Sequence, residues 1–425
     1  MKKIIVLSMI ICQLAISCSS GSDDSNAIED EVATLLQKPY SSLTPDQQKV
    51  KLENEANSMM AQMENSKSAT ALEALANFET LMSISSPDIQ PNRTSKPTIK
   101  TGKSFQKILN ISGTYAIYTW NPTQSIWIKT SSSTELKFIF PASEAATTNN
   151  ATLTASSIAS TVKIVVDDQT GDEMYLPSSV TAVLTINGTL AAKYEANAVY
   201  LNGNPEPTEA GYKLTLNGYV WENYAKRTTP ISAKSSFSYN GNNLIDFNVG
   251  STADIDKLME GSELTKYLGK ANCMISLLDN FVMVADMNME GMANAEGTLE
   301  NSITQPNYNS STYYTDWNAN NKKMSDGEAL AFNKNVKMAL VSKKDGTKLA
   351  DVIQKSEKGN SWEVQSTWNG SYWAYDPYST IKVQEYDTVL YLRFSDNTEV
   401  AMDVYFSSGF DTLETKFQDF INSFN

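Results

Sequence analysis

The hydrophobic pattern near the start of the chain predicts helices over residues 27–86. Thr44, Pro45 and Asp46 supply a start signal, with a capping hydroxyl, a proline at the first helical position and an acid in the first turn. Two apolar stripes follow at helical spacing, at Leu52, Ala56, Met59, Met60 and Met63 and at Ala71, Leu75, Phe78 and Met82. We interpret them as a helical hairpin packed on the body of the protein. A methionine-rich face for a partner is the alternative.

From about residue 100 to residue 250 the period of the pattern changes to two. Val180, Ala182, Leu184 and Ile186 occupy alternate positions, and Asn187-Gly188 comes directly after them. Asn-Gly supplies the positive φ angles that a tight type I′ hairpin turn requires. The same dipeptide recurs at 202–203, 217–218, 240–241 and 369–370. This spacing predicts an antiparallel meander of long strands.

Residues 251–425 mix both periods. Apolar spacing predicts short helices near 255–259 and 264–268, and strands at 276–287, 335–342, 388–394 and 400–406. The chain then ends on a predicted helix. Asp411 and Glu414 form a capping box, and one face is apolar, at Leu413, Phe417, Phe420, Ile421 and Phe424. Such a face predicts a helix that docks on the sheet.

The predicted fold class is therefore α+β. It is mainly an antiparallel β-sheet, a long-stranded meander, with N-terminal amphipathic helices and a C-terminal docking helix. The chain is long enough for two or three domains. We divide it into a signal peptide (1–17), an acidic flexible tether (18–26), a helical segment with a proline-marked linker (27–99), an antiparallel β domain (100–250) and an α+β domain (251–425).

The first residues have the layout of a secretory signal. Lys2 and Lys3 precede a mostly apolar run from Ile4 to Ile16, and small Ser17 precedes Cys18. The run is shorter than the roughly 20 residues that a membrane-spanning helix needs. Ala15, Ile16, Ser17 and Cys18 resemble a bacterial lipobox, which implies cleavage before Cys18 and acylation of its thiol and new amino group. A plain secretory signal with an incidental cysteine is the alternative.

Ser19, Ser20, Gly21 and Ser22 precede Asp23 and Asp24, which is typical of a flexible, solvated tether. Acidic residues at this spacing also resemble the export signal of surface lipoproteins in Bacteroidota. The resemblance implies attachment to the bacterial outer membrane with the protein on the cell surface. The periplasmic face of the same membrane is the alternative.

Two longer stretches carry a family resemblance: GTYAIYTWNPTQSIWIKTSSSTELKFIFPA and YLPSSVTAVLTINGTLAAKYEANAVY. Together with the leader they resemble uncharacterised Bacteroidota cell-surface lipoproteins over about residues 1–250. This resemblance implies an envelope lipoprotein and assigns no chemistry to any residue.

Charge and residue counts exclude several functions. Loss of residues 1–17 removes two lysines and no acid, so the formal charge of −14 becomes −16 in the mature chain. Such a charge argues against nucleic acid as a partner. The chain contains no histidine, which removes Ser-His-Asp and Cys-His catalysis. Cys12 leaves with the leader, so Cys273 has no disulfide partner in the mature chain.

No motif in the chain predicts a metal or a cofactor. Asp167, Asp168, Asp172 and Glu173 could gather oxygen ligands for Ca²⁺, but their spacing fits no EF-hand loop. We interpret them as a solvated hairpin tip. We therefore expect a protein without catalytic residues, cofactor or metal.

Aromatic residues are the candidate ligand-binding groups. One cluster lies within SWEVQSTWNGSYWAYDPYST and includes Trp362, Trp368, Tyr372, Trp373, Tyr375 and Tyr378. A second cluster, in an Asn/Ser-rich segment that we interpret as a loop, consists of Tyr313, Tyr314 and Trp317. Aromatic faces stack on the C–H face of sugar rings, but they also fill the cores of β-sheets. Trp120 and Trp127 fit hairpin packing better than a ligand site.

Two functions remain open from the sequence. The first is a non-catalytic lipoprotein, anchored to the membrane through Cys18, that binds a neutral glycan or another nutrient. The second is a lipid-binding or structural envelope lipoprotein with an apolar groove. Exposed Trp rings in one plane favour the first, and an apolar tunnel lined by Met, Leu and Phe favours the second.

Overall fold

The computed structural model describes residues 25–64, 70–87, 115–132, 135–167, 172–259, 261, 265–407, 410 and 415. Cys18 and most of the tether lie outside these residues, and so does the predicted C-terminal helix except for residue 415. None of the helices in the described part of the chain is long and apolar enough to cross a bilayer.

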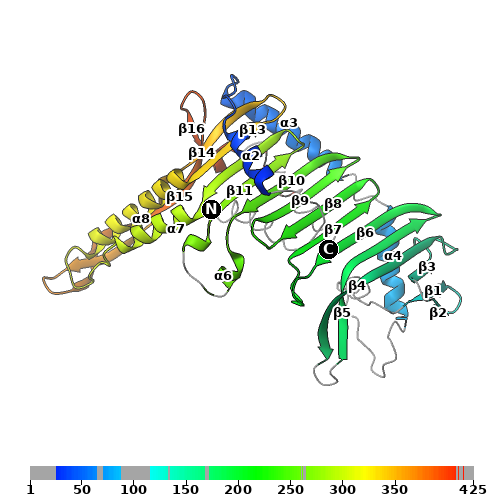
Figure 1. The fold of residues 1–425 in the computed structure, drawn as a ribbon. Coiled ribbons are helices and arrows are strands. Elements are labelled where there is room, and N and C mark those ends of the chain that lie inside the picture. The colour runs from blue at the N-terminus through cyan, green and yellow to red at the C-terminus, as the bar shows by residue number, and fades with distance from the viewer. Residues whose placement is uncertain are drawn as a thin grey trace.

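One large sheet dominates the structure (Figure 1). Within the described residues it has sixteen strands in the order β16 to β3 followed by β1 and β2, so almost every strand pairs with its neighbour in the chain. All described pairings are antiparallel except that of β1 with β3. The predicted class, a mainly antiparallel β-sheet with helices, is confirmed at this level.

The first ten strands are β1 (Ala116–Asn121), β2 (Ile126–Ser131), β3 (Leu136–Phe140), β4 (Ala151–Asp167), β5 (Asp172–Ile186), β6 (Thr189–Val199), β7 (Glu209–Leu216), β8 (Tyr219–Lys226), β9 (Ile231–Tyr239) and β10 (Asn242–Ser251). They are followed by β11 (Lys270–Leu277), β12 (Phe281–Asn288), β13 (Val336–Ser342), β14 (Thr347–Trp368), β15 (Trp373–Arg393) and β16 (Glu399–Ala401). Strands β10 and β11 pair over seven residues, so the sheet is continuous across residue 250. The division into domains at that residue stays a prediction.

The Asn-Gly turns explain the meander. Asn187-Gly188 joins β5 to β6, Asn217-Gly218 joins β7 to β8, and Asn240-Gly241 joins β9 to β10. Both residues of each pair have positive φ angles, as a type I′ turn requires. Glycine has no Cβ to clash in this conformation, and the short polar side chain of asparagine can hydrogen-bond locally, so this pair tolerates two positive φ angles. These turns are therefore where the sequence prediction of the fold is most direct.

Helices cover both faces of the sheet. Helix α2 (Ser25–Leu36) packs Ile28, Val32 and Leu35 against Met274, Val282, Val284, Ala339 and Val341. Helix α3 (Pro45–Glu64) packs Leu52 against Phe281 and Leu340, and its methionines pack against Tyr219, Phe237 and Leu244. Because neighbouring residues of a strand point to opposite faces, Phe281 and Val282 place α3 and α2 on opposite sides.

Helix α4 (Thr70–Ile84) lies at the other end of the sheet (Figure 1). Phe78 packs against Trp127, Phe138 and Phe140, with ring centroids 5.0 to 6.0 Å apart. The helices α3 and α4 thus cover separate parts of the sheet. Trp120 and Trp127 pair across β1 and β2 and are both buried, which is the packing role expected for them.

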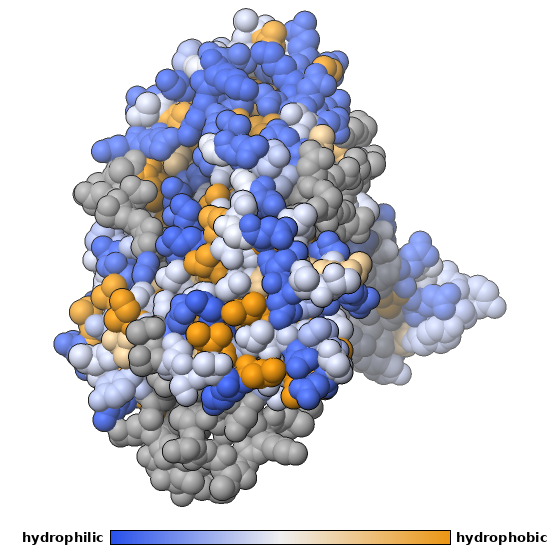
Figure 2. Space-filling model, turned by 90° about the vertical axis from the view of Figure 1, so that its right-hand side faces the viewer, coloured by the Kyte–Doolittle hydropathy of each residue, from blue (hydrophilic) through white to orange (hydrophobic). Residues whose placement is uncertain are grey.

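The edge strand β2 exposes two isoleucines. Ile126 and Ile128 are 42 % and 46 % exposed, whereas Trp127 between them is buried. Figure 2 views the molecule from this end and shows small, separate apolar patches among polar atoms. Scattered exposed apolar residues of this kind are normal on a protein surface.

The strand predicted over 400–406 is wrong in its second half. Strand β16 ends at Ala401, and α9 (Met402–Tyr405) follows as one helical turn. A strand would place Tyr405 on the face opposite Met402 and Phe406. The helical turn instead brings these three residues together in the core cluster that contains Leu392 and Phe394. Burial of Tyr405, which is 5 % exposed, therefore overrides the alternating pattern.

The short helices α6 (Ile255–Met259) and the 3₁₀ turn η2 (Thr265–Tyr267) lie where the sequence predicts helices. Two further helices, α7 (Met289–Asn301) and α8 (Tyr313–Asn335), lie between β12 and β13 and were not predicted.

The hairpin of β14 and β15 extends far beyond the sheet and forms an arm (Figure 1). Strand β13 pairs with β14 only as far as Val352, and β16 pairs only with residues 391–393 of β15. The remaining 353–368 stretch of β14 projects by about 50 Å at the usual rise of 3.3 Å per residue. Helices α7 and α8 lie along this two-stranded ribbon.

Candidate functional site

The two aromatic clusters predicted from the sequence meet at the tip of the arm. The Tyr314 ring of α8 packs edge-on against the Trp373 ring of β15, with centroids 4.9 Å apart. Trp373 also packs against Trp368 across the hairpin, at 5.6 Å. On the helix side, Tyr313 contacts Tyr314, Trp317 and Tyr308, at 5.0, 5.9 and 5.0 Å. We call this connected group of rings, together with Tyr372, Tyr375 and Tyr378 of the same hairpin, the aromatic tip.

The hairpin turn places three tyrosines outside this cluster of rings. The Asn369 side chain accepts the backbone N–H groups of Ser371 and Tyr372, both at 3.0 Å, and Gly370 has a φ angle of +99°. Gln365 pairs with Thr380, and the next residue of β14, Ser366, pairs with Tyr375. The four residues of β15 between them, 376–379, therefore form a bulge. Tyr372, Tyr375 and Tyr378 are consequently 57 %, 75 % and 97 % exposed.

Trp373 holds the two segments of the tip together. Its indole N–H donates to the Ser310 carbonyl at 2.9 Å, and its ring lies between Tyr314 and Trp368. A buried indole needs such an acceptor for its N–H. Four of the rings are half-buried, those of Trp368, Trp373, Tyr313 and Tyr314. The aromatic residues therefore include both rings that pack within the protein and rings that are open to a ligand. Four rings support the tip, and five others face solvent, namely Tyr372, Tyr375, Tyr378, Tyr308 at 53 % exposed and Trp317 at 37 % exposed.

The loop predicted around Tyr313, Tyr314 and Trp317 is wrong, because these residues form the first turns of α8. The helix is hard to recognise because the side chains that contact the ribbon are amides. Asn333 pairs with both backbone groups of Gln354, accepting its N–H and donating to its carbonyl at 2.8 Å. Asn318 accepts from the N–H of Gln384 and donates to the carbonyl of Lys382, both at 2.9 Å.

These asparagines satisfy the free edges of the ribbon. Asn318 and Asn321 bind the β15 edge about midway along the arm, and Asn333 binds the β14 edge near the base. An unpaired strand edge exposes backbone donors and acceptors that invite pairing with another chain. The amides take the place of a neighbouring strand, so α8 crosses the ribbon and fixes its own position on it.

We expect an Asn333→Asp variant to loosen the base of the arm. The carboxylate still accepts the Gln354 N–H but cannot donate to the Gln354 carbonyl, and each lost hydrogen bond costs about 1 kcal/mol. Hydrogen exchange of the amides in 353–358 should become roughly fivefold faster. Asn360→Asp, on the exposed surface of the same ribbon, adds the same charge and serves as the control. Equal exchange in both variants would contradict the role assigned to Asn333.

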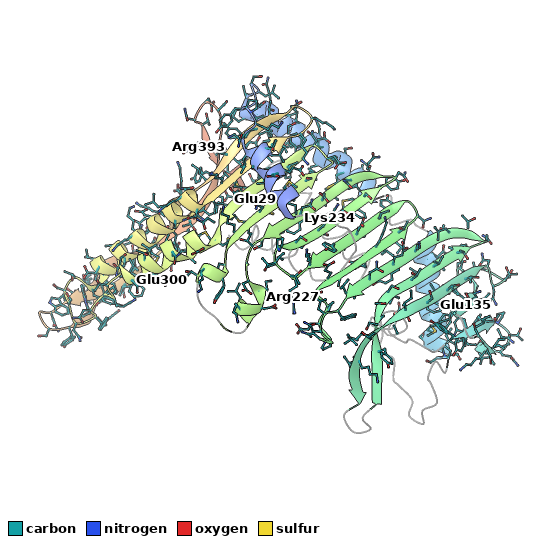
Figure 3. The ribbon with its side chains drawn as sticks, in the orientation of Figure 1. Glu29, Glu135, Arg227, Lys234, Glu300 and Arg393 are labelled. Carbon is teal, nitrogen blue, oxygen red and sulfur yellow. The ribbon has the colours of Figure 1, made fainter. Side chains whose placement is uncertain are left out.

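The tip is nearly free of charge in a strongly acidic protein. Residues 302–315 contain no charged side chain, Asp316 lies between Tyr314 and Trp317, and residues 364–381 contain only Asp376. Figure 3 shows Glu300 partway along the arm and Arg393 at its base. Burial raises the pKa of the Tyr314 hydroxyl, with smaller contributions from Tyr308 and Tyr313, so this group stays neutral. The surface offers aromatic faces, hydroxyls and amides.

An open groove of about 610 Å³ lies farther down the arm, between α7, α8 and β15. Leu299 and Leu330 line it together with Lys322, Lys323 and Asp326. Both lysines are engaged, Lys322 with Asp326 at 2.5 Å and Lys323 with the Ser302 carbonyl at 2.7 Å. This lining is mixed and does not form an apolar tunnel.

The chain shows no match to known protein-family models, curated proteins or solved structures. Among the described residues, no group of three or more Cys, Asp and Glu side chains is arranged to hold a metal ion. The acidic group at 167–173 has side chains outside the described ones. The function is therefore argued from the aromatic tip and from the sequence of the leader.

Proposed function

We propose that this protein is a non-catalytic lipoprotein of the bacterial outer membrane, anchored through Cys18, which binds a neutral glycan with the aromatic tip. The observation that carries the proposal is the union of two aromatic segments with few charged side chains at the end of a projecting arm. We place the protein on the cell surface, in line with its resemblance to Bacteroidota surface lipoproteins. The periplasmic face is the alternative location.

The chemistry of the tip suits sugars. Tyr372, Tyr375 and Tyr378 present rings for the C–H faces of sugar rings, while the neighbouring Ser, Thr and Asn side chains can exchange hydrogen bonds with hydroxyls. Exposed aromatic residues concentrate at binding surfaces because they bury a large area at small entropic cost. The rings of the tip stand edge to face, so they do not form the coplanar set of Trp rings that would favour glycan binding. Support for a glycan ligand comes instead from the exposed tyrosines.

The anchor keeps the sheet close to the membrane. Six residues lie between Cys18 and the start of α2 at Ser25, so the seven Cα–Cα steps span at most about 25 Å. Helix α2 packs on β11 to β13 through Val32, which is fully buried. Detaching α2 from the sheet to lengthen the tether would therefore cost the free energy of this apolar burial. In this proposal the arm, and not the tether, provides the reach of the binding site.

Residues 411–425 complete the proposed fold as the C-terminal docking helix. Phe410 packs against Phe406 at 5.3 Å and joins the core cluster that includes Met283 and Met338. In this proposal the apolar face predicted for residues 411–425 from the sequence packs on the sheet.

The alternative function is a lipid-binding or structural envelope lipoprotein. It is favoured by the half-buried apolar side chains Val249, Ile275 and Met287 on the face that α3 shares. Native mass spectrometry and a glycan array on the mature chain, residues 18–425 produced without its leader, separate the two. We expect binding of neutral oligosaccharides and no bound lipid. A co-purified phospholipid together with a blank array would support the alternative.

A further inference from the structure

Exposed aromatic residues continue from the tip along one face of the arm. Trp362 is 44 % exposed and lies six residues before Trp368 in β14. Trp362 pairs with Val383, and Trp368 pairs with Trp373. The extra residues between these two pairs are all in β15, so β14 alternates without a bulge from Trp362 to Trp368. Even-numbered residues of this stretch therefore point to the same side. Trp362 and Trp368 share a face and are separated by about 20 Å, at 3.3 Å per residue.

This face is uncharged while the opposite one is not. Val364 and its cross-strand partner Ile381 lie between Trp362 and the tip, and both are half-buried. Glu363 and Lys382 form the next cross-strand pair after Trp362 and Val383, so their side chains point to the other side of the ribbon. A ligand that follows the aromatic face from the tip to Trp362 thus meets no formal charge in the ribbon beneath it.

Helix α8 covers the β15 side of this face. Val383, the cross-strand partner of Trp362, is 2 % exposed, and Asn318 binds the helix to the β15 edge at Lys382 and Gln384. On the β14 side Trp362 itself is 44 % exposed, and the hydrogen bonds from Asn333 to β14 are made to Gln354, near the base. Beyond Trp362 toward the base, Lys358 and Glu357 end the uncharged stretch. The accessible neutral face is therefore bounded at both ends.

We propose that the arm binds an extended neutral oligosaccharide laid along this face from the tip to Trp362, and not a single sugar. The inference rests on the proposed function and specifies its ligand. A face of about 20 Å accommodates about four sugar units at roughly 5 Å each. Several weak stacking contacts along one chain add to an affinity that a single ring cannot reach.

Isothermal titration calorimetry on the mature chain tests this with cello-, malto- and manno-oligosaccharides of one to eight units. For the series that binds, we expect affinity to rise at least tenfold from one to four units and then to level off. Trp362→Ala should weaken binding of the six-unit chain about fivefold and leave binding of the two-unit chain unchanged. Trp362→Phe, which keeps a ring, should recover most of the loss.

Tyr175→Ala removes an exposed aromatic residue of β5, outside the arm, and is the matched control. It should leave all affinities unchanged, and the melting temperature of Trp362→Ala should equal that of the parent chain. Equal affinity for two and six units, or no effect of Trp362→Ala on the six-unit chain, would overturn the inference and leave glycan binding intact. Absence of binding at every length in all three series would count against glycan binding itself.

Discussion

A Cys18→Ala variant is expected to lose lipid attachment completely and to leave the outer-membrane fraction. Each acyl CH₂ buried in the bilayer contributes about 0.8 kcal/mol, and two or three chains on one residue give stable anchoring. The measurement is incorporation of labelled palmitate in cells, followed by separation of outer-membrane, inner-membrane and soluble fractions.

Two other cysteines provide controls for this experiment. Cys273→Ala changes a half-buried residue of β11 and should keep both the label and the membrane location. Cys12→Ala alters the predicted leader, which the proposed cleavage before Cys18 removes, and should also keep both. Palmitate incorporation into the Cys18→Ala protein, or its unchanged recovery with the outer membrane, would show that the lipobox interpretation is wrong.

The sheet could be predicted where a local rule determines the structure. Asn187-Gly188 and the later Asn-Gly pairs specify hairpins because few other dipeptides tolerate two consecutive positive φ angles. Alternation in β5 then follows from burial of Ala182 and Leu184 on one face. These are short-range effects, and they are visible in a few consecutive residues.

Helices α7 and α8 could not be predicted in the same way because apolar burial does not define them. No residue of α7 is buried, and α8 buries only Ser325, Ala329 and Ala331. The contacts that fix α8 are hydrogen bonds from Asn318, Asn321 and Asn333 to strand edges. Hydrophobic periodicity cannot report amide pairing, so the segment reads as a polar loop.

The candidate site, like the fold, could be predicted from the sequence only in part. The sequence identifies both aromatic clusters by composition, but it does not show that they touch, because Tyr314 and Trp373 are joined only by the path of α8. Tyr308 was also missed. It lies in the same uncharged run as Tyr313 and contacts its ring at 5.0 Å, so the lack of charge over 302–315 is the signal that could have found it.

A Trp373→Ala variant should have the largest effect on ligand binding, with affinity for a six-unit neutral oligosaccharide falling at least tenfold, or about 1.4 kcal/mol. Trp373 supports the tip through its hydrogen bond to Ser310 and its contacts with Tyr314 and Trp368. Its removal therefore separates the two segments. Trp373→Phe keeps a ring but loses the N–H donor, so an intermediate affinity is expected. Calorimetry gives the affinities, and hydrogen exchange over 302–317 reports the loosened tip.

Trp373→Ala alone cannot distinguish the loss of a ligand contact from the loss of support for the tip. Tyr378→Ala makes this distinction. Tyr378 is 97 % exposed, so its truncation removes almost no contact within the free protein and should leave the melting temperature unchanged. A loss of affinity in this variant therefore reports the loss of a contact between Tyr378 and the ligand. If Trp373→Ala and Tyr378→Ala both bind as tightly as the parent chain, the aromatic tip is not the binding site. If both weaken binding while only Trp373→Ala speeds hydrogen exchange, support and contact are assigned to different rings of the tip.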